Sequence, residues 1–101
     1  MDKRLELHEK FVSILGSRNV YFQPPATVTL QYPAIVYKLS DIDNTFADDE
    51  VYNQSWFYTV TIIDSDPDSE IVKKISRLPK VKFDRYFASD NLNHYVFIIY
   101  Y

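Results

Sequence analysis

Hydrophobic residues recur at helical spacing in two segments of the chain. In residues 2–15 they share one helical face, and Gly16 follows as a residue that readily adopts the positive φ of a helix end. In residues 67–78 they again form one stripe, with Asp66 as the expected N-cap and Pro67 at the first helical position. The pattern therefore predicts two short amphipathic helices. The shared face of the first helix consists of Leu5, His8, Phe11, Val12 and Leu15, with Leu7 and Ile14 flanking it. The buried stripe of the second consists of Ile71, Val72, Ile75 and Leu78.

Alternation of apolar and polar residues predicts strands in most of the remaining chain. Because Pro33 cannot donate a ladder hydrogen bond, we expect the strand after it to begin at Ala34. In a later strand, Val81, Phe83 and Phe87 are expected to point inward. Residues 20–22 should form a short extended piece, and the predicted strands cover residues 27–31 (at a sheet edge), 34–39, 52–63, 81–88 and 94–101.

This order of elements, α-β-β-β-α-β-β, defines the expected fold class. We expect a single α+β domain over residues 1–101, with one mixed or mainly antiparallel sheet of four to five strands and two helices. Residues 89–93 form a turn, so the last two strands should pair as a hairpin.

A polar segment at about residues 40–51 interrupts the strand pattern. It is acidic and contains no basic residue, so we expect a long loop or a protruding hairpin tip. Its acidic residues are Asp41, Asp43, Asp48, Asp49 and Glu50.

The later strands are apolar on both faces, although a sheet with one solvated face should alternate apolar and polar residues. Two short helices on the same side of the sheet can cover only one of its faces. The second face would be covered if the helices instead lay on opposite faces, if the sheet curled on itself, or if neighbouring copies packed against it. Aromatic enrichment at interfaces favours neighbouring copies. The residues predicted to meet a neighbour are Trp56, Tyr58, Tyr95, Phe97, Ile99 and Tyr101.

Composition narrows the function classes. Nine Tyr and seven Phe stand beside one Gly, no Cys and a net charge of −3. The scarcity of Gly disfavours a phosphate-binding loop, and the absence of Cys excludes disulfides and zinc–thiolate sites. No basic stripe of the kind that neutralises nucleic-acid phosphates is present. The longest apolar run, residues 95–101, is much shorter than the roughly 20 residues of a membrane helix, so we expect a soluble, cytoplasmic protein.

Candidate chemical sites are weak. The segment from Asp41 begins like a calcium loop, but Phe46 and Tyr52 occupy the positions that need Gly and Glu. A Ser-His-Asp set could be assembled from Ser89, His94 and Asp90, yet no nucleophile elbow accompanies it. We expect no catalytic residues, no metal and no cofactor, and therefore no enzyme.

Several segments resemble the tail-terminator (tail-completion, head–tail joining) proteins of long-tailed bacteriophages. They are LHEK at 7–10, ILGSRNVYFQPP at 14–25, YPAIVY at 32–37 and DNLNH at 90–94. The resemblance implies a virion structural protein, present in the host cytoplasm during assembly. It implies self-association into a ring, typically a hexamer, between the tail tube and head connector proteins. DNA would pass through the ring without sequence-specific binding.

In such a ring, the acidic segment could line the channel and repel DNA phosphates, or it could dock on a basic neighbour. The alternative function is a non-catalytic cytoplasmic adaptor module that binds a partner through its aromatic sheet, with a peptide added along a sheet edge.

Overall fold

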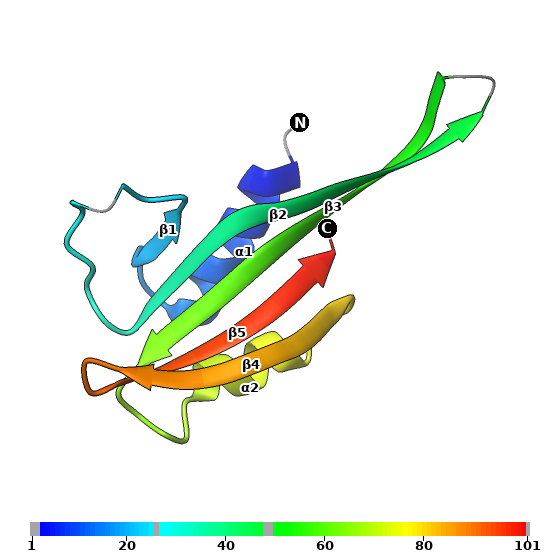
Figure 1. The fold of residues 1–101 in the computed structure, drawn as a ribbon. Coiled ribbons are helices and arrows are strands. Elements are labelled where there is room, and N and C mark those ends of the chain that lie inside the picture. The colour runs from blue at the N-terminus through cyan, green and yellow to red at the C-terminus, as the bar shows by residue number, and fades with distance from the viewer. Residues whose placement is uncertain (1–2, 26, 48–49, 101) are drawn as a thin grey trace.

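The computed structural model describes residues 3–25, 27–47 and 50–100. Its two helices and five-stranded mixed sheet confirm the α+β class and the predicted order of elements. The sheet order is β1-β2-β3-β5-β4; β1 pairs with β2 in parallel, and the other neighbours are antiparallel. The elements are α1 (Lys3–Leu15), β1 (Val20–Phe22), β2 (Ala34–Ala47), β3 (Glu50–Asp64), α2 (Glu70–Ser76), β4 (Val81–Ser89) and β5 (Leu92–Tyr100), as drawn in Figure 1.

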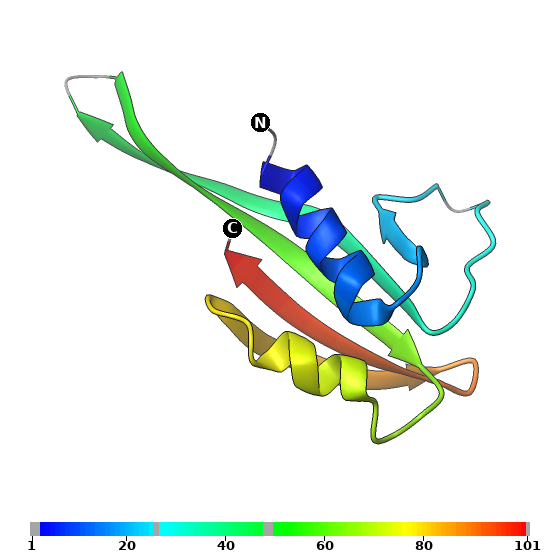
Figure 2. The ribbon, with the colours of Figure 1, turned by 180° about the vertical axis from the view of Figure 1, so that it is seen from behind.

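Both helices lie on the same face of the sheet. They are behind the strands in Figure 1 and in front of them in Figure 2, which views the molecule from the other side. This placement rules out helices on opposite faces. No helix in the described residues has the length and apolar character that crossing a bilayer requires.

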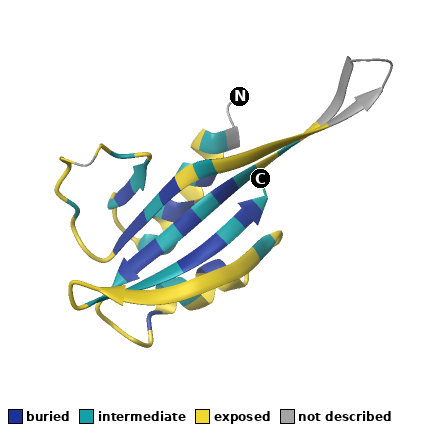
Figure 3. Cartoon of the chain, in the orientation of Figure 1, coloured by how far each residue is buried: buried dark blue, intermediate teal, exposed yellow. Residues whose placement is uncertain are grey.

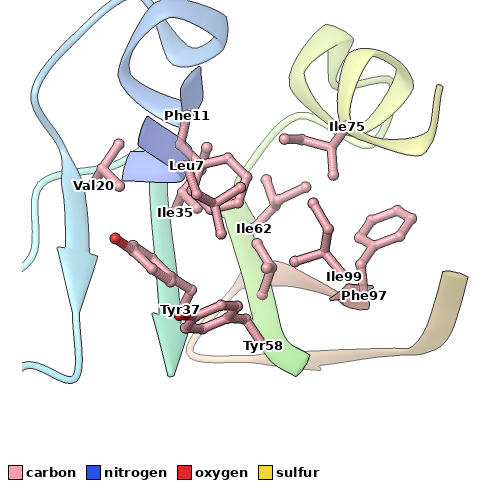
Figure 4. Packing of buried hydrophobic residues seen from close by; sticks show 11 residues of the cluster. Leu7, Phe11, Val20, Ile35, Tyr37, Tyr58, Ile62, Ile75, Phe97 and Ile99 are labelled. Carbon is pink, nitrogen blue, oxygen red and sulfur yellow. The ribbon is translucent and has the colours of Figure 1, made fainter. Parts of the chain in front are cut away.

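The hydrophobic core fills the space between the helices and the sheet, as Figure 4 shows. Phe11 of α1 and Ile75 of α2 are 0% and 1% exposed and point down onto the strands. Tyr37 of β2 lies at the centre, with its ring 5.2 Å from that of Phe11 in an edge-on contact. The even-numbered residues Tyr58, Val60 and Ile62 of β3 form the floor of the core.

The helix ends differ in how well the sequence predicted them. Gly16 has φ +79° and its N–H donates to the Val12 carbonyl at 2.9 Å, which confirms it as the end of α1. The predicted start of the second helix at Pro67 is wrong, because α2 begins at Glu70 after Ser69. The Asp66 carboxylate instead accepts the Asp68 N–H at 2.9 Å, a local turn that competes with helix formation.

The predicted edge strand at residues 27–31 is also wrong, since β1 (Val20–Phe22) forms that edge of the sheet. The Gln23 N–H makes the last bond of this ladder to the Tyr37 carbonyl at 2.9 Å. Gln23 then adopts φ +46°, and Pro24 and Pro25 cannot donate to a ladder, so the chain leaves the sheet.

A β-bulge at Asp84 changes which side chains of β4 share a face. Phe83 pairs with Phe97 on the helix side, whereas Phe87 pairs with His94 on the opposite side. The prediction that Val81, Phe83 and Phe87 all point inward is therefore wrong. Phe83 is 52% exposed and Phe87 is 40% exposed.

The hairpin predicted between the last two strands is confirmed. Its two-residue turn consists of Asp90 and Asn91, with φ +53° and +62°. Positive φ at both central residues is the type I′ geometry, which matches the twist of paired strands and which Asn and Asp tolerate well.

The acidic segment belongs to a long projecting hairpin and not to an irregular loop. β2 and β3 stay paired well beyond the other strands, so the molecule measures 51 × 26 × 24 Å (Figure 1). Of the two structures expected for this segment, the hairpin is the one observed. Asp48 and Asp49 lie outside the described residues.

Candidate protein-interaction surfaces

The sheet face opposite α1 and α2, here called the open face, is turned toward the viewer in Figure 3. Strand pairing places apolar residues along its middle. Many of them are only half-buried within the single chain, and Figure 3 shows these as teal segments between buried ones. The open face consists of Val36 and Lys38 of β2, Phe57, Thr59, Thr61 and Ile63 of β3, Lys82, Arg85 and Phe87 of β4, and His94, Val96, Ile98 and Tyr100 of β5.

Aromatic pairs hold the two ends of this face in place. The rings of Phe57 and Tyr100 lie 5.4 Å apart, and the Lys80 ammonium sits 4.8 Å from the centre of the Tyr100 ring. At the other end, Phe87 stacks on His94 at 4.6 Å with only 16° between the planes. These contacts restrict the side-chain rotamers, so less conformational entropy remains to be lost when a partner covers the face.

The charged residues of the open face are mainly basic. Lys38 lies on one side of the apolar strip, and Lys82 and Arg85 lie on the other; all three are exposed. Among the described residues of the main sheet, the acid next to this face is Asp84, whose carboxylate is 3.7 Å from the Arg85 guanidinium. An exposed pair at that distance contributes little energy, so Arg85 can still interact with another anion.

A shallow depression of about 470 Å³ lies at the β2 side of the open face. Val36, Thr59 and Thr61 line it from the strands, and Gln23 and Pro24 line it from the loop after β1. Lys38 is its one titratable lining group apart from the buried Tyr37. Such a surface suits a protein side chain better than a substrate that needs several converging polar groups.

The second surface is the part of the β2–β3 hairpin beyond the main sheet, residues 40–56, here called the arm. Asp41 and Asp43 are exposed and lie on the same side as the open face, because they pair with Phe57 and Ser55. The other side of the arm carries Ile42 and Trp56, which are 38% and 37% exposed. The side chains of Asp48, Asp49 and Glu50 lie outside the described part of the chain.

Most of the residues predicted to meet a neighbour lie on the helix side of the sheet. Tyr58, Phe97 and Ile99 are core residues, 5%, 2% and 2% exposed, so they present no surface in this structure. Tyr95 packs against the same core, and its hydroxyl donates to the Pro67 carbonyl at 3.3 Å. Trp56 is exposed on the arm, and Tyr101 lies outside the described residues.

The residues predicted to meet a neighbour therefore lie mainly on the face that the helices cover. The opposite set includes Phe57, Ile98 and Tyr100, but it also includes Thr59 and Thr61, whereas Tyr58, Val60 and Ile62 on the helix side are all apolar. The two Thr residues were therefore the signal in the sequence for the face that the helices leave uncovered.

The two histidines occupy structural positions. His8 Nδ1 lies 2.7 Å from the Tyr37 hydroxyl, which also accepts a hydrogen bond from Arg4 Nη1 at 3.1 Å. Burial, and then the positive charge of Arg4, lower the pKa of His8 below its usual value. His94 Nδ1 lies 3.2 Å from the Leu92 carbonyl, and the His94 ring stacks on the Phe87 ring, so both contacts of His94 are with neighbouring parts of the β4–β5 hairpin.

Within the described residues, no group of three or more His, Cys, Asp or Glu side chains is arranged to hold a metal ion. No known protein-family model matches this chain, and no curated protein matches it either.

Proposed function

We propose that this chain is a ring-forming structural subunit of a bacteriophage virion, a tail-terminator or tail-completion protein at the head–tail junction. The observation that carries the proposal is the open face, an ordered sheet surface with half-buried aromatic and aliphatic residues opposite both helices. Such a surface is expected where another protein subunit packs.

The charge distribution supports a protein partner over a nucleic acid. Single-stranded nucleic acid could stack on exposed aromatic rings, but it needs a basic groove along the backbone. The open face offers the separated cations Lys38, Lys82 and Arg85, while the arm beside it carries the exposed Asp41 and Asp43. In this proposal DNA passes the assembled ring without sequence-specific binding, because separated cations do not make the continuous basic groove that the phosphates of a bound strand need.

The resemblance of residues 7–10, 14–25, 32–37 and 90–94 to tail-terminator proteins supplies the identity of the partners. In this proposal the chain associates with copies of itself, typically six. The ring contacts the tail tube on one side and the head connector on the other.

The adaptor alternative has one observation in its favour. β4 is an edge strand of nine residues, and a peptide could in principle add to it. However, the bulge at Asp84 interrupts its regular hydrogen-bond pattern, a feature that blunts edges against added strands. The bulge therefore counts against a peptide adding to β4 in the adaptor module.

Negative-stain imaging of the purified chain at high concentration tests the proposal. We expect rings with a central opening, together with a native mass that is a fixed multiple of the 12.0 kDa chain. A stable dimer without higher species would favour the adaptor module and contradict the ring.

A further inference from the structure

We propose that the arm of one copy docks on the open face of the next copy, with the Asp41 and Asp43 side facing Lys38, Lys82 and Arg85. The inference rests on the proposed self-association and specifies the two surfaces that make the contact.

Charge complementarity is the first argument. Residues 40–56, the arm, contain five acids and no base. The open face of the main sheet bears three exposed cations, and the Asp84 carboxylate lies 3.7 Å from one of them, Arg85. Complementary potentials of this kind set the register of an interface and suppress wrong pairings.

Area is the second argument. Neighbouring strands are about 4.8 Å apart and residues about 3.3 Å apart, so four strands paired over about eight residues present roughly 500 Å². A stable protein interface buries about 800 Å² on each partner. The open face alone is therefore too small, and an arm that reaches across it from a neighbour increases the contact on both copies.

Topology is the third argument. The arm and the open face are different patches of the same chain, and the arm extends well past the other strands. One copy can therefore use its arm on one neighbour and its open face on another. A contact between two different patches is head-to-tail, and repeated contacts of this kind close into a ring when the rotation permits.

A charge-swap experiment tests the contact. The arm variant carries Asp41→Lys and Asp43→Lys, and the face variant carries Lys38→Glu and Lys82→Glu. In each variant alone, the substituted positions of the arm and the face carry like charges, so we expect its self-association to weaken by about tenfold or more. A mixture of the two variants, or one chain carrying all four changes, restores opposite charges and should recover association.

The matched control is Arg18→Glu with Lys74→Glu, two exposed cations outside the proposed contact. It changes the net charge by the same amount as the face variant, and it should leave association near the wild-type level. Association is measured by sedimentation velocity at low salt, and urea unfolding shows whether each variant remains folded.

Cysteine cross-linking provides a second measurement, because the natural chain has no Cys. Copies with Asp43→Cys and copies with Lys82→Cys should form a mixed disulfide-linked pair faster than copies with Asp43→Cys and Arg18→Cys. Equal rates for both mixtures would overturn the docking of the arm on the open face.

The outcomes separate the two proposals. Rings that form equally well in every charge variant would overturn the arm contact and leave the ring subunit intact. A wild-type chain that neither associates at its highest soluble concentration nor cross-links selectively would overturn both.

Discussion

Two phenylalanines on opposite faces of β4 allow a direct test of which face meets a neighbour. Phe87 lies on the open face and stacks on His94 at 4.6 Å, whereas Phe83 lies on the helix side with its ring 5.3 Å from that of Phe97. They are 40% and 52% exposed, so the two sites are closely matched. We predict that Phe87→Thr weakens self-association and that Phe83→Thr does not.

The size of the effect follows from the exposed area. A Phe side chain covers roughly 200 Å², so 40% exposure leaves about 80 Å² for a partner to bury. At about 25 cal/mol per Å² this area contributes about 2 kcal/mol to each contact, which corresponds to roughly thirtyfold in the dissociation constant. Thr is a good strand former, so the backbone pairing of β4 should survive.

The assay is sedimentation velocity over a concentration series for the wild type and both variants. Each variant also loses part of a packed ring, so each should reduce the free energy of unfolding by about 1–2 kcal/mol, which urea unfolding measures. If Phe83→Thr weakens self-association as much as Phe87→Thr, or if neither variant changes self-association, the open face is not the surface that meets a neighbour.

Three further predictions concern the fold. Tyr37→Phe removes a buried hydroxyl that lies 3.1 Å from Arg4 Nη1 and 2.7 Å from His8 Nδ1. The free energy of unfolding in urea should fall by about 1–2 kcal/mol, and an unchanged value would contradict a stabilising role for these hydrogen bonds. Burial lowers the pKa of His8 in the fold, so its contribution to stability is complete above the unfolded pKa of about 6.5 and is lost as the pH falls below it. Between about pH 7 and pH 5, the free energy of unfolding should therefore fall more steeply for the wild type than for His8→Gln. Parallel curves of this free energy against pH would contradict the prediction. Gly16→Ala should lower the free energy of unfolding, measured by heat or urea, by about 1 kcal/mol, because an L residue is strained at φ +79°. No atom lies within 4 Å of the added Cβ, so the backbone strain is the cause of this loss. An unchanged free energy of unfolding would mean that the helix end relaxes.

Local patterns in the sequence were sufficient for much of the fold. The helical spacing of apolar residues and the single Gly predicted α1, although Leu5 of its predicted apolar face is 51% exposed, and Pro33 predicted the start of β2 at Ala34. These features depend on neighbours a few residues apart, so a sequence contains them directly. The element order was also correct, although β1 and not residues 27–31 forms the edge strand.

The errors arose where tertiary structure decides between local alternatives. The bulge at Asp84 shifts the alternation of β4 by one residue, which moves Phe87 to the open face. The face that the helices cover had a signal in β3, where Thr59 and Thr61 mark the opposite face, but the wholly apolar face was taken for the interface. Tyr58, Phe97 and Ile99 are in the core, although the sequence analysis had placed them at the interface.

Locating the chain in an assembled particle is the decisive measurement for the proposed ring subunit at the head–tail junction. A tag fused before α1, on the helix side, would leave the open face unobstructed. Imaging of phage particles assembled with the tagged chain should place the label at the junction of head and tail, in a ring of several copies. Particles that contain no label, or that carry it elsewhere, would contradict the account.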